Sequence, residues 1–332
     1  MNKNECTGIW VYAEQQSGKQ ESTSFELLAK AQELKAVLNE EITAVVVGSN
    51  LSHLASDLIV HGADKVLLLD NANLANYSAR PYQKVLADAA LKYKPSIFIF
   101  PASTQGRDVA PRVMCALGTG LTADAVDLGF DEEGAFVQTT PAFGGSLLAH
   151  ICIPELRPQM VTVRAHVFDA VPANPERTGV VINEPVEVDA DNDYEVVEVV
   201  PTVVEGKPIN ESEVLVAGGR GIKSEQDIDM LHELATLLGG DLACSRPLCD
   251  NGWLDHSLQI GQSGTTVKPK FIVNVGISGS VQYMVGMQKS GLIASINTYD
   301  RAEILNISQY SAICDYSELI PAIIAEIKKR KA

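Results

Sequence analysis

Apolar runs alternate with segments of helical periodicity along the N-terminal third of the chain. The runs occupy residues 7–14, 41–49, 65–70 and 96–103, and the periodic segments occupy residues 24–38, 51–62 and 80–93. Continuous apolar runs are typical of strands buried on both faces, and apolar residues repeated every three or four positions are typical of helices. This alternation predicts a parallel sheet covered by helices.

The pattern changes in the middle of the chain. A loop leads into a further helix within 104–128, and from 135 to 200 shorter β-like runs are interrupted by Gly and Pro. We expect these runs to extend the first sheet with antiparallel strands. The polar segment 201–212 holds two prolines. It predicts a boundary between an N-terminal domain, 1–205, and a C-terminal domain, 206–332.

A second alternating unit follows this boundary. Its predicted strands are 213–221, 241–245, 270–276, 292–298 and 310–315, and its long helices are 224–240 and 317–332. Local signals predict the helix ends: Ser24 and Ser224 as N-caps, Gly239 as a C-terminal stop, and Pro321 in the first turn of the last helix. The fold class is therefore expected to be α/β, with two domains.

Composition excludes some classes of function. The 332 residues suffice for two domains with cores of their own. A formal net charge of −16 works against binding to nucleic acid or to an anionic membrane surface. No apolar run reaches membrane-spanning length, and residues 1–20 are polar and acidic without a signal-peptide pattern. We therefore expect a cytoplasmic protein.

The cysteines and histidines suggest neither a disulfide framework nor a metal centre. None of the six cysteines forms a CxxC pair, and the six histidines form no HExxH or HxH arrangement. We expect reduced thiols and no metal ligands. A disulfide between Cys244 and Cys249 is the less favoured alternative.

The stretch 245–279 concentrates groups that hold a polar cofactor. Two polar loops, SRP and GQSGTT, precede a buried strand, KFIVNVG, that ends in a GISG turn. A helix predicted at 280–288 follows, and a helix N-terminus favours phosphate or another anion. The stretch and this helix are rich in hydroxyls, amides and a guanidinium: Ser245, Arg246, Gln259, Gln262, Ser263, Thr265, Thr266, Ser278 and Gln282.

Catalytic interpretations of the same residues find little support. The GGRG turn at 218–221 is not the GxGxxG dinucleotide pattern, and GQSG lacks the last glycine of a GxSxG nucleophile turn. No motif places a base beside Ser263, which disfavours a hydrolase. An adenylate-using transferase requires a phosphate loop and a catalytic base, and neither is found. Asp315 either caps the last helix or touches a ligand, and the residues alone leave both interpretations open.

Several motifs taken together resemble one family. They are GRDVAPRVMCALGTGLTADAVDL (106–128), PAFGG (141–145), RPQMVTVR (157–164), GGRGIKS (218–224), SRPLCDNGW (245–253), QIGQSGTTVKP (259–269), GISGSVQYMVGM (276–287), INTYD (296–300) and CD (314–315). In this order they resemble the electron transfer flavoprotein alpha subunit over nearly the whole chain.

The resemblance implies a fold, a cofactor and partners. The family is similar to two doubly wound, Rossmann- or flavodoxin-like domains with mainly parallel sheets, the second holding one FAD. Its alpha subunit works as a heterodimer, the N-terminal domain contacting a beta subunit that holds AMP or a second FAD. It passes electrons between an acyl-CoA dehydrogenase-type partner and another carrier, and has oxidoreductase activity only within that complex.

Two versions of this function stay open. In a simple carrier, the beta subunit holds AMP and the FAD of this chain alone moves electrons. In an electron-bifurcating complex, a second FAD in the beta subunit accepts hydride from NADH and sends one electron to ferredoxin or flavodoxin. The residues that decide lie in the beta subunit. An alternative from another class is a non-redox adenine-nucleotide sensor or assembly subunit, which a colourless purified protein would favour.

The resemblance also assigns residues by position. By similarity, Arg220 and Ser245 flank the cofactor, and Arg246 lies by the isoalloxazine. The flavin is lined by Ile260, Gly261, Gln262 and Ser263, with the Ser263 hydroxyl near N5. The ribityl chain and pyrophosphate are followed by Ser278, Gly279, Ser280, Val281, Gln282 and Tyr283, and the adenosine end is held by Asn297 and Asp315.

One of these positions departs from the family pattern. The family often has His where this chain has Tyr283, at a place expected near flavin O2. A cation beside the ring and a hydrogen bond at N5 stabilise the negatively charged, one-electron reduced flavin. A phenol donates one hydrogen bond but does not become cationic near neutral pH. We therefore expect this chain to hold that form of the flavin less tightly.

Overall fold

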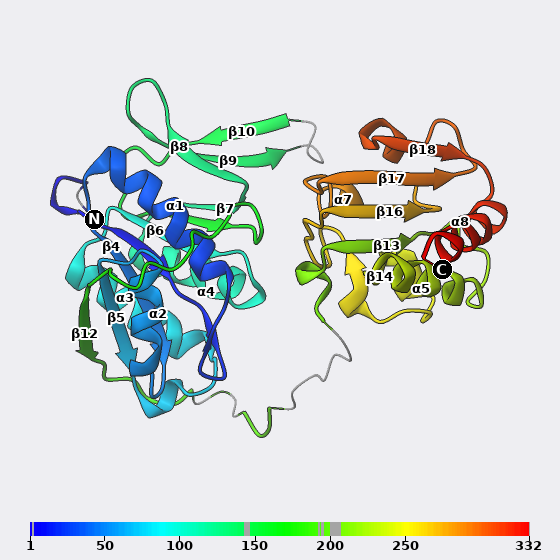
Figure 1. Ribbon diagram of the computed structural model, residues 1–332. Helices are drawn as coiled ribbons and strands as arrows, with labels where there is room; N and C mark the ends of the chain where they lie inside the picture. Colours follow the sequence, from blue (N-terminus) through cyan, green and yellow to red (C-terminus); the bar gives the residue numbers. More distant parts are fainter. Residues whose placement is uncertain (2, 143–146, 192, 194–195, 200–206, 332) are drawn as a thin grey trace. The chain divides into compact units, whose positions relative to one another are not determined.

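The computed structural model describes residues 1, 3–142, 147–191, 193, 196–199 and 207–331. The chain divides into two compact units, Met1–Val199 and Val200–Ala332, and each is described by itself (Figure 1). The boundary expected between residues 205 and 206 lies outside the described residues.

A seven-stranded sheet organises the N-terminal unit. Its strand order is β12-β5-β4-β1-β6-β11-β7, and all neighbouring strands pair in parallel. The strands are β1 (Ile9–Tyr12), β4 (Ile42–Gly48), β5 (Lys65–Asp70), β6 (Ile97–Pro101), β7 (Leu121–Ala125), β11 (Gln159–Val163) and β12 (Val180–Pro185). Residues of β1 and β4 are fully buried, as the continuous apolar runs predict.

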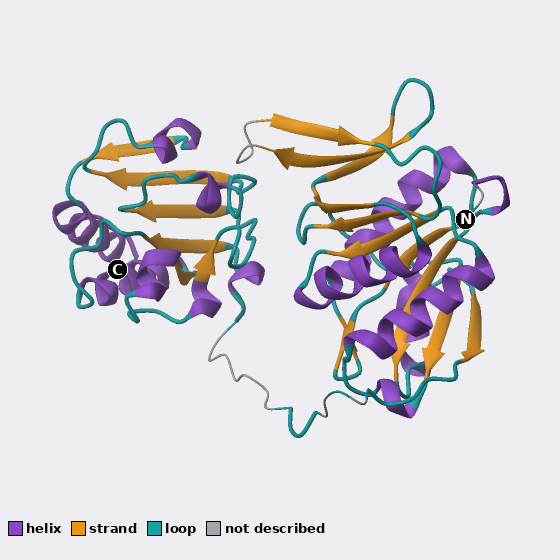
Figure 2. Ribbon diagram, turned by 180° about the vertical axis from the view of Figure 1, so that it is seen from behind, coloured by secondary structure: helices purple, strands orange, loops and turns teal. Residues whose placement is uncertain are grey.

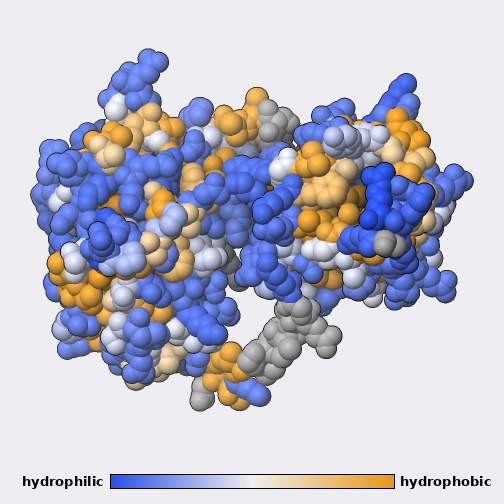
Figure 3. Space-filling view, in the orientation of Figure 1, coloured by the Kyte–Doolittle hydropathy of each residue, from blue (hydrophilic) through white to orange (hydrophobic). Residues whose placement is uncertain are grey.

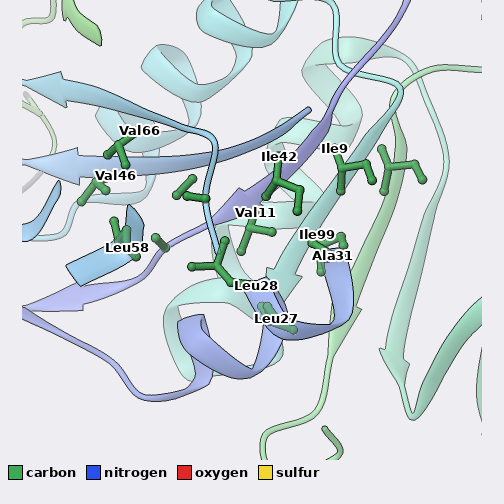
Figure 4. Packing of buried hydrophobic residues seen from close by; sticks show 14 of the residues in the cluster. Ile9, Val11, Leu27, Leu28, Ala31, Ile42, Val46, Leu58, Val66 and Ile99 are labelled. Atoms are coloured by element: carbon green, nitrogen blue, oxygen red, sulfur yellow. The ribbon is translucent and has the colours of Figure 1, made fainter. Parts of the chain in front are cut away.

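Helices cover both faces of this sheet (Figure 2). They are α1 (Thr23–Leu38), α2 (Ala55–Val60), α3 (Ala79–Tyr93) and α4 (Thr104–Leu117). Side chains of a strand alternate between faces, so Ile9 and Val11 pack with α1 and α2, whereas Trp10 and Tyr12 pack with α3 and α4. Figure 4 shows the first of these layers, with Leu27, Leu28 and Ala31 of α1 beside Val11 and Ile99 of the sheet.

The middle of the chain differs from the expected antiparallel extension. Strands β8 (Asp127–Phe130), β9 (Phe136–Ala142) and β10 (Leu147–Ile151) pair antiparallel with each other as a separate three-stranded sheet. In contrast, β11 and β12 join the main sheet in parallel. The prediction was wrong for these two strands. Every residue of β11 is buried, which is typical of a parallel strand in a sheet that helices cover on both faces.

The separate sheet exposes apolar side chains. Leu147 and Leu148 on β10 have exposed fractions of 59% and 58%. Figure 3 shows apolar surface at the place that β10 occupies in Figure 1, within a mostly hydrophilic surface.

The C-terminal unit has a six-stranded parallel sheet of order β15-β14-β13-β16-β17-β18. Its strands are β13 (Val214–Gly218), β14 (Asp241–Ser245), β15 (Gln259–Ile260), β16 (Phe271–Val275), β17 (Leu292–Asn297) and β18 (Tyr310–Ile313). Its helices are α5 (Asp227–Leu238), α6 (Arg246–Asp250), α7 (Val281–Met284) and α8 (Tyr316–Lys331). The two units confirm the predicted α/β class with doubly wound, mainly parallel sheets.

Short elements complete the two units. The antiparallel pair β2 (Gln15–Gln16) and β3 (Lys19–Gln20) follows β1. The 3₁₀ turns are η1 (Lys3–Glu5), η2 (Ser52–Leu54), η3 (Ala72–Leu74), η5 (Ile209–Glu211), η6 (His256–Leu258) and η7 (Glu303–Ile307). Along the part of the chain that the structure describes, no helix combines the length and the apolar character needed to cross a bilayer.

Several predicted helix ends are corrected by tertiary contacts. Helix α1 begins at Thr23, and the Ser24 hydroxyl donates to the Glu14 carbonyl in the neighbouring loop instead of capping. Helix α5 begins three residues after Ser224, whose hydroxyl donates to the Asp227 carboxylate. Pro321 lies inside α8, beyond its first turn. The stop at Gly239 is confirmed, with a left-handed φ of 73° and its N–H bonded to Ala235 and Thr236.

Candidate functional site

A cavity of about 510 Å³ lies at the carboxyl edge of the C-terminal sheet. It is lined by Arg220, Gly221, Ser245, Arg246, Pro247, Gln259, Ile260, Gly261, Gln262, Ser263, Gly276, Ile277, Ser278, Ser280, Gln282, Tyr283, Asn297, Tyr299 and Ala302. These residues come from the ends of β13, β14, β15, β16 and β17 and the loops after them. In open parallel sheets this edge is where ligands bind.

Glycines bring the first of these loops together. The loop after β13 contacts the loop after β16, where the Gly221 N–H donates to the Gly276 carbonyl at 2.9 Å. A Cβ at Gly221 would stand 2.9 Å from the Gly276 Cα, and Gly276 has a left-handed φ of 62°. Two backbones in such contact leave no room for side chains. The GGRG motif therefore serves close packing and places Arg220 at the cavity.

The GQSG segment forms a tight turn beside α7. The Gln262 N–H donates to the Gln282 carbonyl at 2.8 Å, and the Gly264 N–H donates to the Gly261 carbonyl at 3.0 Å. Gln259 Nε2 donates to the Ser263 hydroxyl at 3.0 Å. Because the Ser263 oxygen acts as the acceptor there, its own proton can be donated to a ligand.

The cavity is electropositive in an acidic chain. Arg220 and Arg246 contribute two guanidinium groups, and none of the described residues lining the cavity is a carboxylic acid. Arg246 pairs with Asp250 one turn along α6, with a separation of 3.3 Å between Nε and Oδ2. That pair is largely exposed and leaves the guanidinium within reach of the cavity. In a chain with a formal net charge of −16, this local excess of positive charge favours an anionic ligand.

Most of the residues expected at a cofactor do line this one cavity. They are Arg220, Ser245, Arg246, Ile260, Gly261, Gln262, Ser263, Ser278, Ser280, Gln282, Tyr283 and Asn297. Gly279 and Val281 lie between lining residues of the same turn without lining the cavity themselves. Gly279 instead packs on η7, where an added Cβ would meet the Ile304 nitrogen at 2.1 Å.

Asp315 is not among the described residues that line the cavity. Its Oδ2 pairs with Lys223 Nζ at 2.5 Å, and its Oδ1 accepts the Ser317 N–H at 3.0 Å at the start of α8. The Lys223 hydrogen bond and the Ser317 N–H lower the pKa of the Asp315 carboxyl to about 2. Of the two interpretations left open by the sequence, the geometry is that of a helix cap.

Tyr283 lines the cavity, but its hydroxyl points elsewhere. The side chain is 3% exposed, and its Oη donates to Asn274 Oδ1 on β16 at 2.6 Å. A phenol has one proton to donate, so in this arrangement the hydroxyl has no proton left for a ligand at the position expected for flavin O2.

The helix predicted at 280–288 is shorter than expected. Helix α7 has four residues, Val281–Met284. A single turn carries little of the macrodipole of a longer helix, so the expected attraction for phosphate rests on the arginines and on the polar turn before α7.

Several residues that line the cavity were not among those expected at the cofactor. They are Gly221, Pro247, Gly276, Ile277, Tyr299 and Ala302. Each is a neighbour in a loop that was already singled out, and Tyr299 follows Asn297 by two positions after β17. Extending each motif to the end of its loop is the signal that would have found them.

Two thiols lie in β14 and α6, close in sequence to residues that line the cavity. Cys244 and Cys249 are buried free cysteines with their sulfur atoms 3.3 Å apart. Burial raises the pKa of both thiols, and it does so strongly for Cys244. Buried, protonated thiols are unreactive.

Comparisons with known proteins agree with this location. The family model described as the electron transfer flavoprotein domain matches residues 9–189, and the one described as the electron transfer flavoprotein FAD-binding domain matches residues 208–288. The second range contains the cavity residues from Arg220 to Tyr283.

Curated relatives match over the whole chain. The electron transfer flavoprotein subunit alpha of Clostridium acetobutylicum is 41% identical over 332 residues, covering 99% of each chain. That of Megasphaera elsdenii is 41% identical over 335 residues, covering 100% of this chain and 99% of the relative. The LctC subunit of the lactate dehydrogenase (NAD(+),ferredoxin) of Acetobacterium woodii is 40% identical, covering 99% of this chain and 78% of its own length.

Proposed function

The chain belongs to the electron transfer flavoprotein alpha-subunit family, and on that premise we propose that it binds one FAD in the cavity of its C-terminal unit and passes electrons between a dehydrogenase and a second carrier. The observation that supports this most is the cavity itself. Its two arginines lie at the carboxyl edge of a parallel sheet, within the range that matches a FAD-binding domain.

The residues present fit a flavin dinucleotide. The volume of about 510 Å³ lies in the ordinary range for cofactor sites. The lining combines guanidinium groups for a pyrophosphate, hydroxyls and amides for a ribityl chain, and the apolar Ile260 against a ring. The chemistry of the bound cofactor is the exchange of one or two electrons.

The roles of individual residues follow the positions assigned by similarity. Arg246 holds positive charge beside the ring system, and the Ser263 hydroxyl, which keeps a proton to donate, faces N5. Arg220 and the 278–280 turn bind the phosphate side. Asp315 is not proposed as a contact, because its carboxylate is bonded to Lys223 and to the start of α8.

We place the partner contact on the N-terminal unit. A beta subunit that holds AMP or a second FAD completes the carrier, and the N-terminal unit contacts it. The exposed Leu147 and Leu148 on β10 support this, because they lie where the surface has an apolar area (Figure 3), and such areas mark interaction surfaces.

A second candidate is membership of an electron-bifurcating complex. The name of one relative joins a lactate dehydrogenase with both NAD(+) and ferredoxin. By that likeness, the FAD of this chain takes one of two electrons that a second FAD in the beta subunit receives from NADH. The dehydrogenase is then either of acyl-CoA type or a hydroxy-acid dehydrogenase.

The flavin and AMP content of the chain, purified with a co-expressed beta subunit, tests both candidates. One FAD with one AMP per heterodimer is expected for the simple carrier. Two FAD, no AMP and bleaching of the flavin absorbance by NADH are expected for bifurcation. A complex without flavin contradicts both candidates and favours the adenine-nucleotide sensor.

A further inference from the structure

A network of hydrogen-bonded polar groups, most of them buried, runs through the C-terminal unit. Tyr283 Oη donates to Asn274 Oδ1 at 2.6 Å, and Asn274 Nδ2 donates to the Ser295 hydroxyl at 3.3 Å. The Ser295 and Ser308 hydroxyls lie 2.7 Å apart, and the Ser308 hydroxyl donates to the Ile304 carbonyl at 2.7 Å. These contacts connect α7, β16, β17 and η7 in sequence.

The core around this hydrogen-bond network is otherwise apolar. Tyr283 packs in one cluster with Leu215, Ile272, Met287 and Ile293, while Asn274 and Ser295 are 1% and 2% exposed. Polar groups in such surroundings add little stability over apolar ones of the same shape, but they fix one arrangement because each unpaired group is costly. Burial raises the pKa of the Tyr283 phenol well above its ordinary value, so the hydroxyl remains a donor at physiological pH.

Both ends of this hydrogen-bond network hold backbone that forms the cavity. At one end, α7 carries the lining residue Gln282, whose carbonyl accepts the Gln262 N–H at 2.8 Å and so fixes the GQSG turn. At the other end, the Ile304 N–H donates to the Ser278 carbonyl at 3.2 Å. The network therefore fixes two turns, the GQSG turn at 261–264 and the turn that holds Ser278, relative to the same two strands, β16 and β17.

We infer that Tyr283 and Asn274 are positioning residues for the cofactor, acting through α7 on the 261–263 turn and not by contact between the Tyr283 hydroxyl and the flavin. The inference rests on the proposed function, since it requires FAD in the cavity. Asn274 gives it a sharp test, because Asn274 is buried in β16 and is not among the lining residues.

The experiment compares Tyr283→Phe, Asn274→Leu and the double variant in the full-length chain. Each single change is expected to weaken FAD binding roughly five- to thirty-fold, the effect of one lost interaction. Both are expected to shift the visible circular dichroism of the bound flavin in the same way. The double variant should be no weaker than either single, because both residues act through one hydrogen bond.

Tyr82→Phe is the matched control. Tyr82 is also buried and donates its hydroxyl to a backbone carbonyl, that of Leu74, but it belongs to the N-terminal unit and does not line the cavity. This variant should leave FAD affinity and the dichroism of the flavin unchanged.

A readout without cofactor separates this inference from the proposed function. In the cofactor-free chain, both single variants are expected to speed hydrogen exchange at the Gln262 amide, which is bonded to Gln282. Unchanged exchange and unchanged FAD affinity would overturn the inference, and so would a loss of affinity in Tyr283→Phe but not in Asn274→Leu, which indicates direct contact. A wild-type chain that binds no FAD contradicts the proposed function and, with it, this role, even where the exchange effect is present.

Discussion

Arg246 places a positive charge at the cavity, and its ion pair resembles that of another helical arginine in the chain, Arg112. Its guanidinium pairs with an acid one helical turn away, Asp250, and its side chain is 66% exposed. Arg112 in α4 pairs in the same way with Asp108 and is 49% exposed, but it does not line the cavity. The two positions therefore separate the role of a cavity arginine from that of an ordinary helical ion pair.

We predict that Arg246→Gln weakens FAD binding roughly tenfold to a hundredfold, the size expected for a lost charge-assisted hydrogen bond. Arg112→Gln should change FAD affinity by less than about twofold, because surface ion pairs contribute little. Titration of the deflavinated chain, followed by flavin fluorescence, measures both. Equal losses in the two variants would contradict a specific role for Arg246.

Glu14 is a carboxylic acid of the N-terminal unit whose burial disfavours its charged form. It follows β1, and burial raises the pKa of its carboxyl above the ordinary value of 4.5, although a hydrogen bond from Ser103 opposes the shift and nearby Glu21 adds to it. A carboxyl whose pKa is raised in the folded state is stabilising when protonated. That stability is lost as the pH rises through 4.5 toward the folded pKa.

Glu14→Gln is therefore expected to raise the free energy of unfolding at pH 8 and to have a much smaller effect near pH 4. Urea unfolding at the two pH values measures the difference. Glu132→Gln, on an exposed turn, is the control for the substitution itself. A larger stabilisation at pH 4 than at pH 8 has the wrong sign and would refute the argument.

At the scale of the element, glycines with similar backbone angles meet different surroundings. Gly279, in the turn before α7, has a φ of 85°, and an added Cβ would stand 2.1 Å from the Ile304 nitrogen. Gly252, after α6, has a φ of 73° and nothing within 4 Å of such a Cβ. The pair distinguishes the cost of a left-handed backbone from the cost of a steric clash.

Gly252→Ala should reduce the free energy of unfolding by about 1–2 kcal/mol, the cost of a left-handed alanine. Gly279→Ala adds an overlap with the backbone of η7. It should reduce the free energy of unfolding by roughly a further 1–3 kcal/mol. It should also weaken FAD binding, because the turn bears Ser278 and Ser280. Equal effects of the two variants on unfolding would show that η7 moves aside.

The elements also show how far local signals extend. Gly239 ends α5 as predicted, because a left-handed stop depends on the backbone of one residue. The caps at Ser24 and Ser224 failed, because their hydroxyls donate to the Glu14 carbonyl and the Asp227 carboxylate. Helix α7 ends after four residues, whereas a helix was expected over the nine positions 280–288. Such choices depend on which partner the fold brings near.

On the scale of the whole molecule, each unit has its own buried clusters on both faces of its own sheet. Units with separate cores unfold separately unless a strong interface couples them. A ligand that binds one native unit stabilises that unit by mass action, by about 2.7 kcal/mol at a free concentration one hundred times its dissociation constant.

Calorimetry of the deflavinated chain is accordingly expected to show two unfolding transitions. Adding FAD should raise the temperature of one of them by several degrees and leave the other in place. AMP in place of FAD is the control for a site that recognises only the adenine end. A shift of both transitions by FAD would contradict a site confined to the C-terminal unit. An equal shift by AMP would contradict a site that recognises the flavin end.

The sequence by itself determined the α/β class, the parallel sheets and the loops that bear the cavity. Buried parallel strands need continuous apolar runs, as in Ile9–Tyr12, and polar residues after such strands must meet at one edge. These are consequences of chain direction and local composition, which one sequence contains.

Only the tertiary structure decided between which strands β11 inserts, to which group the Tyr283 hydroxyl donates and with which residue Asp315 pairs. Val161 of β11 pairs with β6 and β7. The Tyr283 hydroxyl donates to Asn274, and Asp315 pairs with Lys223, 92 positions away in the sequence. Each outcome is a competition between partners distant in the chain, and a polar group goes to whichever acceptor or donor packing brings within hydrogen-bond distance.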